Sequence, residues 1–322
     1  MIPLRLLPVL LSSLAVWTQA HAQPYPTRPV RMVIPLPPGG VTDAMGRLLA
    51  QKFSESWGQP VVPDNRPGGA GIIAAEAVAR ATPDGHTLLL GNINTHGINP
   101  SLYPRMPYDP VRDFVPVTLL VSVPNLLLVH PALPAKNVQE LIALGRAKPG
   151  TLNASSPGNG TSGHMGVAVF VSMTGVKITH VPYKGPAPAL QAVMGGETQM
   201  VFDTIFQALP HARAGRVKAL GLSVPQRSAL APEIPTIAEQ GLPDFNVSPW
   251  FALFATAGTP PATIRKLHAE TVTVMEKPDV SERLQSQGLK IELGTPAALA
   301  GYVKSEIARW NKVVREAGIK VE

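Results

Sequence analysis

The feature that most constrains the fold is a repeated order of short apolar runs and longer segments with helical spacing. Residues 30–36, 60–65 and 86–92 are short and apolar, as expected of buried strands, and residues 42–58 and 68–81 between them have the spacing of helices. Parallel strands need a crossover connection, usually a helix. The order therefore predicts a parallel α/β sheet covered by helices, with a polar loop after residue 92.

The same order returns in the middle of the chain, and a last strand precedes the C-terminal helices. A second α/β unit inserted into the first would make two chain crossings, near Ser122–Pro124 and Asn246–Pro249, both extended and marked by proline. We therefore expect two α/β lobes joined by two crossing strands, with a ligand cleft between them, because closure about such a hinge is a known mode of ligand capture. The expected boundaries are 23–123 with 248–322 for lobe 1 and 124–247 for lobe 2.

The first 22 residues have the pattern of a secretory signal peptide. Arg5 is followed by the apolar run LLPVLLSSLAVW and then by Ala20-His21-Ala22, which gives a basic start, an apolar centre and a small-residue cleavage site. The run is shorter than the ~20 apolar residues of a spanning helix, so we expect cleavage rather than anchoring. The mature chain would begin at Gln23 in the periplasm. Cysteine is absent, so the exported chain relies on packing instead of disulfides.

The formal charge of +7 at pH 7 does not indicate a nucleic-acid partner. Basic residues are scattered singly, and no basic run is interleaved with aromatic residues, which make up only 5% of the chain. A mild positive field helps to gather anionic small molecules, although a soluble surface with spare lysines explains the charge equally well.

Two glycine-rich loops, residues 35–43 (PLPPGGVTD) and 156–164 (SPGNGTSGH), each follow a predicted strand and open a predicted helix. Glycines let the backbone turn its N–H groups toward a ligand, and the unpaired amides and dipole of a helix N-terminus favour an anion. Thr42, Thr161 and Ser162 add hydroxyl donors that suit carboxylate or phosphate oxygens. Each loop read alone is explained better as a helix cap after a tight turn than as an anion site, because such caps are common.

Known nucleotide, catalytic and metal motifs are missing from the sequence. No Gly-Lys-Ser/Thr occurs, and GNGTSG (158–163) has no suitable acid at the distance that a dinucleotide site needs. G-x-S-x-G and a cysteine nucleophile are absent, and the eight histidines show no metal-binding spacing. We therefore expect no cofactor, no metal and no enzymatic activity.

Several polar side chains near strand ends have two interpretations each. His96, His164 and His180 are either cleft residues or structural hydrogen-bonders. Asp203 ends the apolar strand MVFD and is either an acceptor for an amine or hydroxyl in the cleft or the cap of the next turn. Asp43 fits a helix cap better than a ligand group.

Six long motifs follow one another along the chain: IPLPPGGVTDAMGRLLA, DNRPGGAGIIAAEAVARATPDGHTLLLGN, SPGNGTSGHM, THVPYKGPAPAL, EIPTIAEQGLPDF and TAGTPPATIRKL. Together they resemble the Bug family, the periplasmic solute receptors of tripartite tricarboxylate transporters. The resemblance runs from about residue 25 to 322. It implies a periplasmic binding protein type II-like fold that encloses its ligand between the two lobes.

The resemblance also implies which residues bind the ligand. In that family the two glycine-rich loops hold a carboxylate through backbone amides, hydroxyl groups and ordered water without a charged clamp, and neither loop here contains arginine. The sides of the pocket would come from the NINTHG loop, VPYKG and the end of the MVFD strand. The residues expected to contact the ligand are Leu36, Pro38, Gly39, Gly40, Thr42, Asn92, Thr95, His96, Asn159, Gly160, Thr161, Ser162, Tyr183 and Asp203.

Two positions depart from the family pattern. Family members commonly carry an aromatic residue where Leu36 stands and a Glu near Ala168. We expect Leu36 to reshape the distal pocket and the missing acid to alter helix packing.

The expected function is that of a monomeric, non-enzymatic solute-binding protein that captures a small carboxylate and delivers it to integral membrane permease subunits. The ligand stays open among dicarboxylates, tricarboxylates, aromatic acids and amino acids. Two alternatives are a receptor that reports its ligand to a signalling partner and a secreted hydrolase with His96 or His164 as its base.

Overall fold

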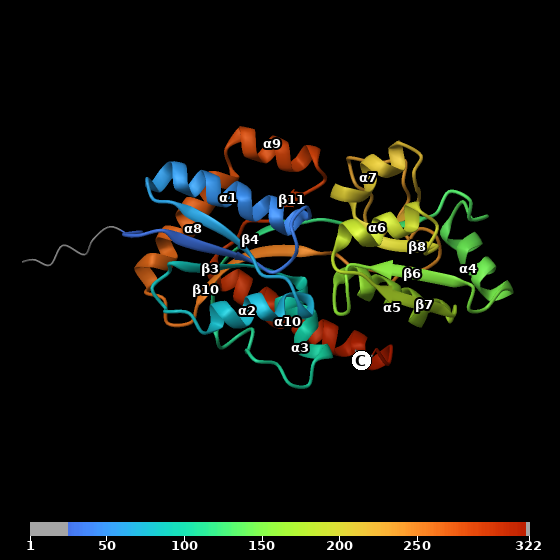
Figure 1. Ribbon diagram of the computed structural model, residues 1–322, viewed down its shortest axis with the longest axis horizontal. Helices are drawn as coiled ribbons and strands as arrows, with labels where there is room; N and C mark the ends of the chain where they lie inside the picture. Colours follow the sequence, from blue (N-terminus) through green and yellow to red (C-terminus); the bar gives the residue numbers. More distant parts are fainter. Residues whose placement is uncertain (1–24, 320–322) are drawn as a thin grey trace, which may run out of the picture.

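The computed structural model describes residues 25–319 and contains two β-sheets that lie side by side, each with its own helices (Figure 1). The predicted signal peptide, residues 1–22, lies outside the described residues. One sheet has six strands in the order β11-β4-β10-β3-β1-β2, and the other has five in the order β7-β6-β8-β5-β9. The expected α/β fold with two lobes is confirmed.

The first lobe is the six-stranded sheet with its helices. Its strands are β1 (Val30–Ile34), β2 (Val61–Asn65), β3 (Thr87–Asn92), β4 (Phe114–Ser122), β10 (Trp250–Thr256) and β11 (Lys290–Ile291). Its helices are α1 (Val41–Trp57), α2 (Ile72–Ala79), α3 (Asn99–Leu102), α8 (Pro261–Met275), α9 (Pro278–Ser286) and α10 (Pro296–Glu316), with the short turns η1 (Gly69–Gly71) and η2 (Asn94–Ile98).

The second lobe is the five-stranded sheet with its helices. Its strands are β5 (Asn125–Val129), β6 (Leu152–Ser156), β7 (Ile178–Pro182), β8 (Met200–Thr204) and β9 (Lys218–Leu222). Its helices are α4 (Val138–Ala147), α5 (Ser162–Thr174), α6 (Pro186–Met194) and α7 (Ile205–Arg213). Within residues 25–319, no helix of either lobe has the length and apolar character needed to cross a bilayer.

The direction of each strand follows from where the chain enters its sheet. β1, β2 and β3 are parallel, as are β6, β7 and β8, because helical crossovers connect them. β10 is antiparallel to β3 and β4, and β5 is antiparallel to β8 and β9. The sheets are therefore mixed, which corrects the expectation of a wholly parallel sheet. The chain enters β5 and β10 from the other lobe. Both strands therefore begin at the junction between the lobes, where the strands paired with them in the sheet end.

Two crossing segments connect the lobes, and they are hydrogen-bonded to each other. β4 passes directly into β5 through Val123–Pro124, and the chain returns from β9 to β10 through residues 223–249. The Val123 N–H donates to the Pro249 carbonyl (2.9 Å). The Asn125 N–H, which directly follows the first crossing, donates to the Ser223 hydroxyl (3.0 Å), and that hydroxyl donates to the Val247 carbonyl of the returning segment (2.6 Å). The two crossings therefore run side by side at the junction.

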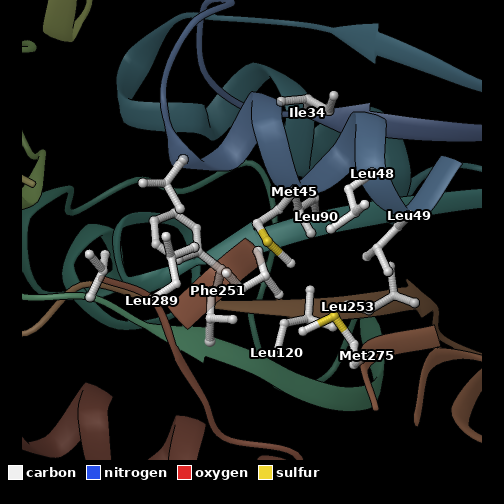
Figure 2. Packing of buried hydrophobic residues seen from close by; sticks show 14 of the residues in the cluster. Ile34, Met45, Leu48, Leu49, Leu90, Leu120, Phe251, Leu253, Met275 and Leu289 are labelled. Carbon is white, nitrogen blue, oxygen red and sulfur yellow. The ribbon is translucent and has the colours of Figure 1, made fainter. Parts of the chain in front are cut away.

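Helix α1 illustrates how the apolar spacing of the sequence becomes packing. Met45, Leu48 and Leu49 are buried on the face that covers the first sheet, where they pack with Ile34 and Leu90 (Figure 2). Each such buried side chain contributes roughly 1.5–3 kcal/mol relative to an exposed one. This packing fixes the position of the α1 N-terminus, which follows the first glycine-rich loop.

The segment after β3 is helical, which corrects the expectation of a polar loop there. The Asn92 side-chain oxygen accepts hydrogen bonds from the N–H groups of Asn94 (3.0 Å) and Thr95 (3.2 Å) and so starts the π-helical turn η2. Pro100 then occupies the first turn of α3. The polar side chains of this segment thus build a buried turn. The two-residue strand β11 is too short to show any periodicity in the sequence.

Replacing Gly46 with alanine should destabilise the protein. A Cβ at this position in α1 would lie 2.6 Å from Ile34 Cδ1 and 2.8 Å from Ile34 Cγ1, so the buried Ile34 side chain or the helix itself would have to shift. We expect Gly46→Ala to lower the free energy of unfolding by about 1–3 kcal/mol. The matched control is Gly301→Ala in α10, where a Cβ meets nothing within 4 Å. It should be neutral or stabilising by up to ~1 kcal/mol. Equal urea midpoints for the two variants would contradict this account of α1 packing.

Candidate ligand-binding site

A cavity of about 50 Å³ lies where the two lobes meet. The first lobe and the returning crossing segment contribute Leu36, Gly40, Val41, Thr42, Asn92, Ile93, Asn94, Pro249 and Phe251. The second lobe contributes Asn125, Pro157, Thr161, Ser162, Gly163, Pro186, Phe202, Asp203, Thr204 and Gln207. Most of these residues lie at strand ends that meet the junction or in the turns that follow, where open α/β sheets bind their ligands.

The lobes are closed over this cavity. A Cβ placed on Gly40 in the first lobe would be 3.5 Å from Pro186 Cγ and 3.7 Å from Gln207 Oε1 in the second. The Ser162 N–H donates to the Asn94 side-chain oxygen (3.1 Å), which is a direct bond between the lobes. Small-molecule sites usually measure about 300–1,000 Å³. The closed cavity has room for only a few water molecules, so the lobes must separate to admit a solute.

Four helices begin at the cavity wall. The first residues of α1, α5, α6 and α7 are Val41, Ser162, Pro186 and Ile205, and the cavity is lined by the start of each helix or by the residue before it. No N-cap side chain accepts a hydrogen bond from the first turn of α1, α6 or α7. Pro186 and Pro188 carry no N–H in α6, and the Ile205 N–H of α7 donates to the Pro124 carbonyl (2.9 Å). The first N–H groups of a helix have no partner within it, and each N-terminus carries a partial positive charge. The converging helices therefore favour an anion.

The first glycine-rich loop is held in place by hydrogen bonds on the side away from the cavity, so the side that lines the cavity keeps free donors. The Asp43 carboxylate accepts hydrogen bonds from the Gly39 N–H (3.1 Å), Arg47 Nε (3.0 Å) and Asn65 Nδ2 (3.0 Å). Burial alone would raise the pKa of Asp43, but these bonds hold it below its usual value. Asp43 thus supports the loop from the third position of α1, and the N-cap is Gly40 rather than Asp43. Thr42 makes no side-chain hydrogen bond within residues 25–319 and lines the cavity.

The second glycine-rich loop caps α5 with its own side chains. The Thr161 hydroxyl donates to the Gly158 carbonyl (2.7 Å) and accepts from the His164 N–H (3.4 Å). The Gly160 N–H donates to His164 Nδ1 (3.2 Å). Several donors of this loop are therefore already used in the closed form. The Ser162 hydroxyl remains free to donate into the cavity, as far as the contacts within residues 25–319 show.

The structure divides the predicted site residues into two groups. Those that line the cavity are Leu36, Gly40, Thr42, Asn92, Thr161, Ser162 and Asp203. Those that do not line it are Pro38, Gly39, Thr95, His96, Asn159, Gly160 and Tyr183. The first group comes mostly from residues that directly precede or start a helix.

The residues outside the cavity have other contacts. Thr95 and His96 are completely buried, and the His96 ring stacks on Phe254 with 3.8 Å between ring centroids. Burial lowers the pKa of His96 to about 3, so this side chain is neutral at physiological pH. The Tyr183 hydroxyl donates to Glu197 (3.0 Å) on the surface. Pro38 and Gly39 are exposed at the tip of their loop.

Several polar residues of the cavity were not predicted from the sequence. They are Asn94, Asn125, Thr204 and Gln207. Asn94 belongs to the NINTHG segment, but its helical turn directs Asn94, rather than Thr95 and His96, toward the junction. Asn125 is the first residue after the crossing, a position that no local motif marks. Two buried atoms of this group have no hydrogen-bond partner within residues 25–319: Asn125 Nδ2 and Thr204 Oγ1.

Asp203 is the only ionisable side chain that lines the cavity among the described residues. It is 4% exposed, and its Oδ1 accepts the Thr204 N–H (2.7 Å) while Oδ2 has no partner within residues 25–319. Burial raises the pKa of this carboxyl to about 7, against the smaller lowering effect of the Thr204 bond. No Lys, Arg or His side chain reaches the lining from the described chain. The helix ends therefore supply its positive potential.

A larger groove of about 680 Å³ lies beside the crossing segments and differs in chemistry. Its lining comes from residues 224–230, 285 and 288–292 with parts of the two crossings. No helix of the second lobe begins there. The described residues also contain no group of three or more His, Cys, Asp or Glu placed to hold a metal ion. The small cavity is therefore the better candidate for an anion site.

The ligand-free protein should show a stability effect of Asp203 that depends on pH. Its folded pKa lies above the unfolded value of 3.8, so the folded state binds more protons between pH 4 and 7 and this group lowers stability as pH rises. We expect Asp203→Asn to gain stability relative to the parent protein between pH 5 and pH 8, by about 2–3 kcal/mol at most. Thermal unfolding of refolded, ligand-stripped protein at both pH values measures the difference. If the stability difference between Asp203→Asn and the parent protein were the same at pH 5 and pH 8, ionisation of Asp203 would not destabilise the folded state and this prediction would be wrong.

The second loop should weaken in acid because it depends on neutral histidine. Burial lowers the pKa of His164 to about 4, and His164 Nδ1 accepts the Gly160 N–H. Stability from this group is fully present above the unfolded value of 6.5 and is lost as pH falls toward 4. His164→Asn keeps an acceptor near the Nδ1 position without titrating there. The variant should match the parent at pH 8 within ~1 kcal/mol and lose less stability between pH 6.5 and 4.5. Parallel losses in both proteins would contradict this role.

Comparison with known proteins agrees with this geometry. Residues 45–319 match the family described as the tripartite tricarboxylate transporter family receptor. The chain is 36% identical to the protein BugT of Bordetella pertussis over 315 residues, which covers 98% of this chain and 97% of BugT.

Two solved structures share the fold over nearly the whole chain. Rpa4515 of R. palustris with adipate has a TM-score of 0.88 and 38% sequence identity, covering 92% of this chain and 99% of that one. MatC (Rpa3494) from Rhodopseudomonas palustris with bound malate has a TM-score of 0.85 and 37% identity, covering 90% of this chain and 100% of that one. The expected resemblance to Bug proteins is confirmed, and the chain belongs to the receptor family of tripartite tricarboxylate transporters.

Proposed function

We propose that this protein is a periplasmic receptor that captures a small carboxylate between its lobes and delivers it to membrane permease subunits. The observation that carries the proposal is the convergence of four helix N-termini on one cavity that no cationic side chain of the described chain lines. Such ends favour an anion without a charged clamp. The adipate and malate bound to the two similar structures support a carboxylate.

Capture requires the lobes to move apart, since the closed cavity of about 50 Å³ is well below the roughly 300–1,000 Å³ of small-molecule sites. We take residues 23–123 with 248–322 as one rigid unit and 124–247 as the other. Rotation would then occur at the two crossing segments, which are short and extended at Val123–Pro124. Hinge closure of this kind buries a solute and removes it from water.

The proposal includes no chemical step on the ligand. The hydrolase alternative needs His96 or His164 as a base, but His96 is sealed in the core and His164 Nδ1 accepts a backbone N–H. Neither side chain lines the cavity. The signal-peptide pattern of residues 1–22 supports export, and we expect the receptor to work as a monomer.

Removing cavity hydroxyls should weaken carboxylate binding. Thr42→Val and Ser162→Ala each remove one donor at a helix N-terminus, and an unpaired buried ligand oxygen costs about 1–3 kcal/mol, or about 5- to 150-fold in affinity. The matched control is Ser305→Ala, an exposed position on α10. Titration calorimetry with a panel of di- and tricarboxylates, aromatic acids and amino acids measures the affinities. Binding that is unaffected by either cavity variant would place the ligand elsewhere, and no binding by the parent would overturn the proposal.

A further inference from the structure

Asp203 presents a buried oxygen that nothing in the described chain satisfies. It stands near the end of β8 on the cavity wall, where the Thr204 N–H holds Oδ1 at 2.7 Å and Oδ2 is buried without a partner within residues 25–319. Buried polar atoms normally find a hydrogen-bond partner, and an unpaired one calls for an explanation. Because Asp203 lines the cavity, a small movement of its side chain would bring Oδ2 to a solute held there.

A carboxylate ligand would share this small cavity with the Asp203 carboxylate, so two negative charges would lie close together. The helix N-termini attract a carboxylate, whereas an ionised Asp203 repels one, because two like charges in one enclosed site cannot both stay bare. Protonation of Asp203 removes this repulsion below its pKa of about 7, whereas above that pH the repulsion disappears only if a hydrogen-bond donor stands between the two anions. The other unpaired atoms of the cavity, Asn125 Nδ2 and Thr204 Oγ1, can donate to the ligand. Ionised Asp203 can only accept.

We propose that Asp203 selects carboxylates that carry a hydroxyl or ammonium group, whose O–H or N–H donates to Oδ2. The inference rests on the proposed function, because it names the subclass of carboxylate that the same site prefers. An unsubstituted chain leaves Oδ2 unpaired in the closed form. A hydroxy or amino acid satisfies it and places its own carboxylate toward the helix ends.

Few other charges compete with Asp203 for the ligand. The elements packed against β8 are β5, β6, α5, α6 and α7. The ionisable side chains on these elements are His164 on α5 and His211 and Arg213 on α7. None of the three lines the cavity. The pKa of His164 is about 4, so its charge does not change between pH 6 and 8.

Succinate, malate and aspartate form a matched set, because they share a carbon chain and differ only in hydrogen, hydroxyl or ammonium at one carbon. The set glutarate, 2-hydroxyglutarate and glutamate repeats the comparison one carbon longer. We expect the parent protein to bind the substituted members of the better-fitting set at least ~10-fold tighter than the plain acid. Titration calorimetry at pH 7.5 measures each affinity.

Asp203→Asn is the informative variant. Because the Thr204 N–H holds Oδ1, the amide nitrogen of the substituted side chain would take the place of Oδ2 and turn an acceptor into a donor. The preference for substituted acids should therefore fall to within ~3-fold or reverse, through weaker binding of malate or aspartate and tighter binding of succinate. Glu233→Gln is the control, since it removes one exposed negative charge of the same lobe away from the cavity. It should leave the preference unchanged.

A pH series adds a readout that general damage to the site would not produce. Ionised Asp203 is the form that accepts, so affinity for aspartate should rise between pH 6 and 8 in the parent and stay flat in Asp203→Asn. Equal affinity for plain and substituted acids, or a preference that survives in Asp203→Asn, would overturn the inference and leave the proposed function standing. Absence of binding by all six acids would also overturn the inference, and only absence of binding by the whole carboxylate panel described above would overturn the proposed function.

Discussion

The Val123 N–H bond to the Pro249 carbonyl holds the two crossing segments together at the point where both meet the six-stranded sheet. Ser223 extends the link, because its hydroxyl joins Val247 and also accepts the Asn125 N–H. The lobes therefore share one paired connection rather than two independent linkers. Such a connection limits relative motion to rotation about the pair. The same strand ends and helix starts then face each other whenever the lobes close.

The electrostatics of the junction follow from that arrangement. Helix α1 of the first lobe and helices α5, α6 and α7 of the second bring their N-termini to the junction, so the cavity favours an anion without a lysine or arginine among the described residues that line it. Backbone dipoles are fixed by the fold and lose no side-chain entropy on binding, unlike an arginine clamp. A buried acid can then persist beside them. Asp203 introduces a requirement for a donor into a site that otherwise attracts any small anion.

The sequence predicted the architecture better than it predicted the site. Strand and helix order, the crossings at Pro124 and Pro249 and the two glycine-rich loops follow from local periodicity and turn residues. The antiparallel β5 and β10 did not, because direction depends on which lobe the chain comes from. In the site, Thr42 and Asp203 were predicted from helix-start and strand-end positions. Asn94 was missed and His96 misplaced, since the turn η2 decides which side chains face the junction.

The bond between Ser162 and Asn94 has a consequence for how affinity should be understood. In the closed form the α5 N-terminus gives its Ser162 N–H to Asn94 of the other lobe, so closure satisfies this donor even without a solute. An arriving anion that uses the same N–H must replace a bond that already exists. The empty closed state is thus a competitor for the ligand, and its population lowers the apparent affinity in proportion. The measured dissociation constant for any solute will therefore depend on the stability of the Ser162–Asn94 bond in the empty closed form as well as on the solute's own contacts.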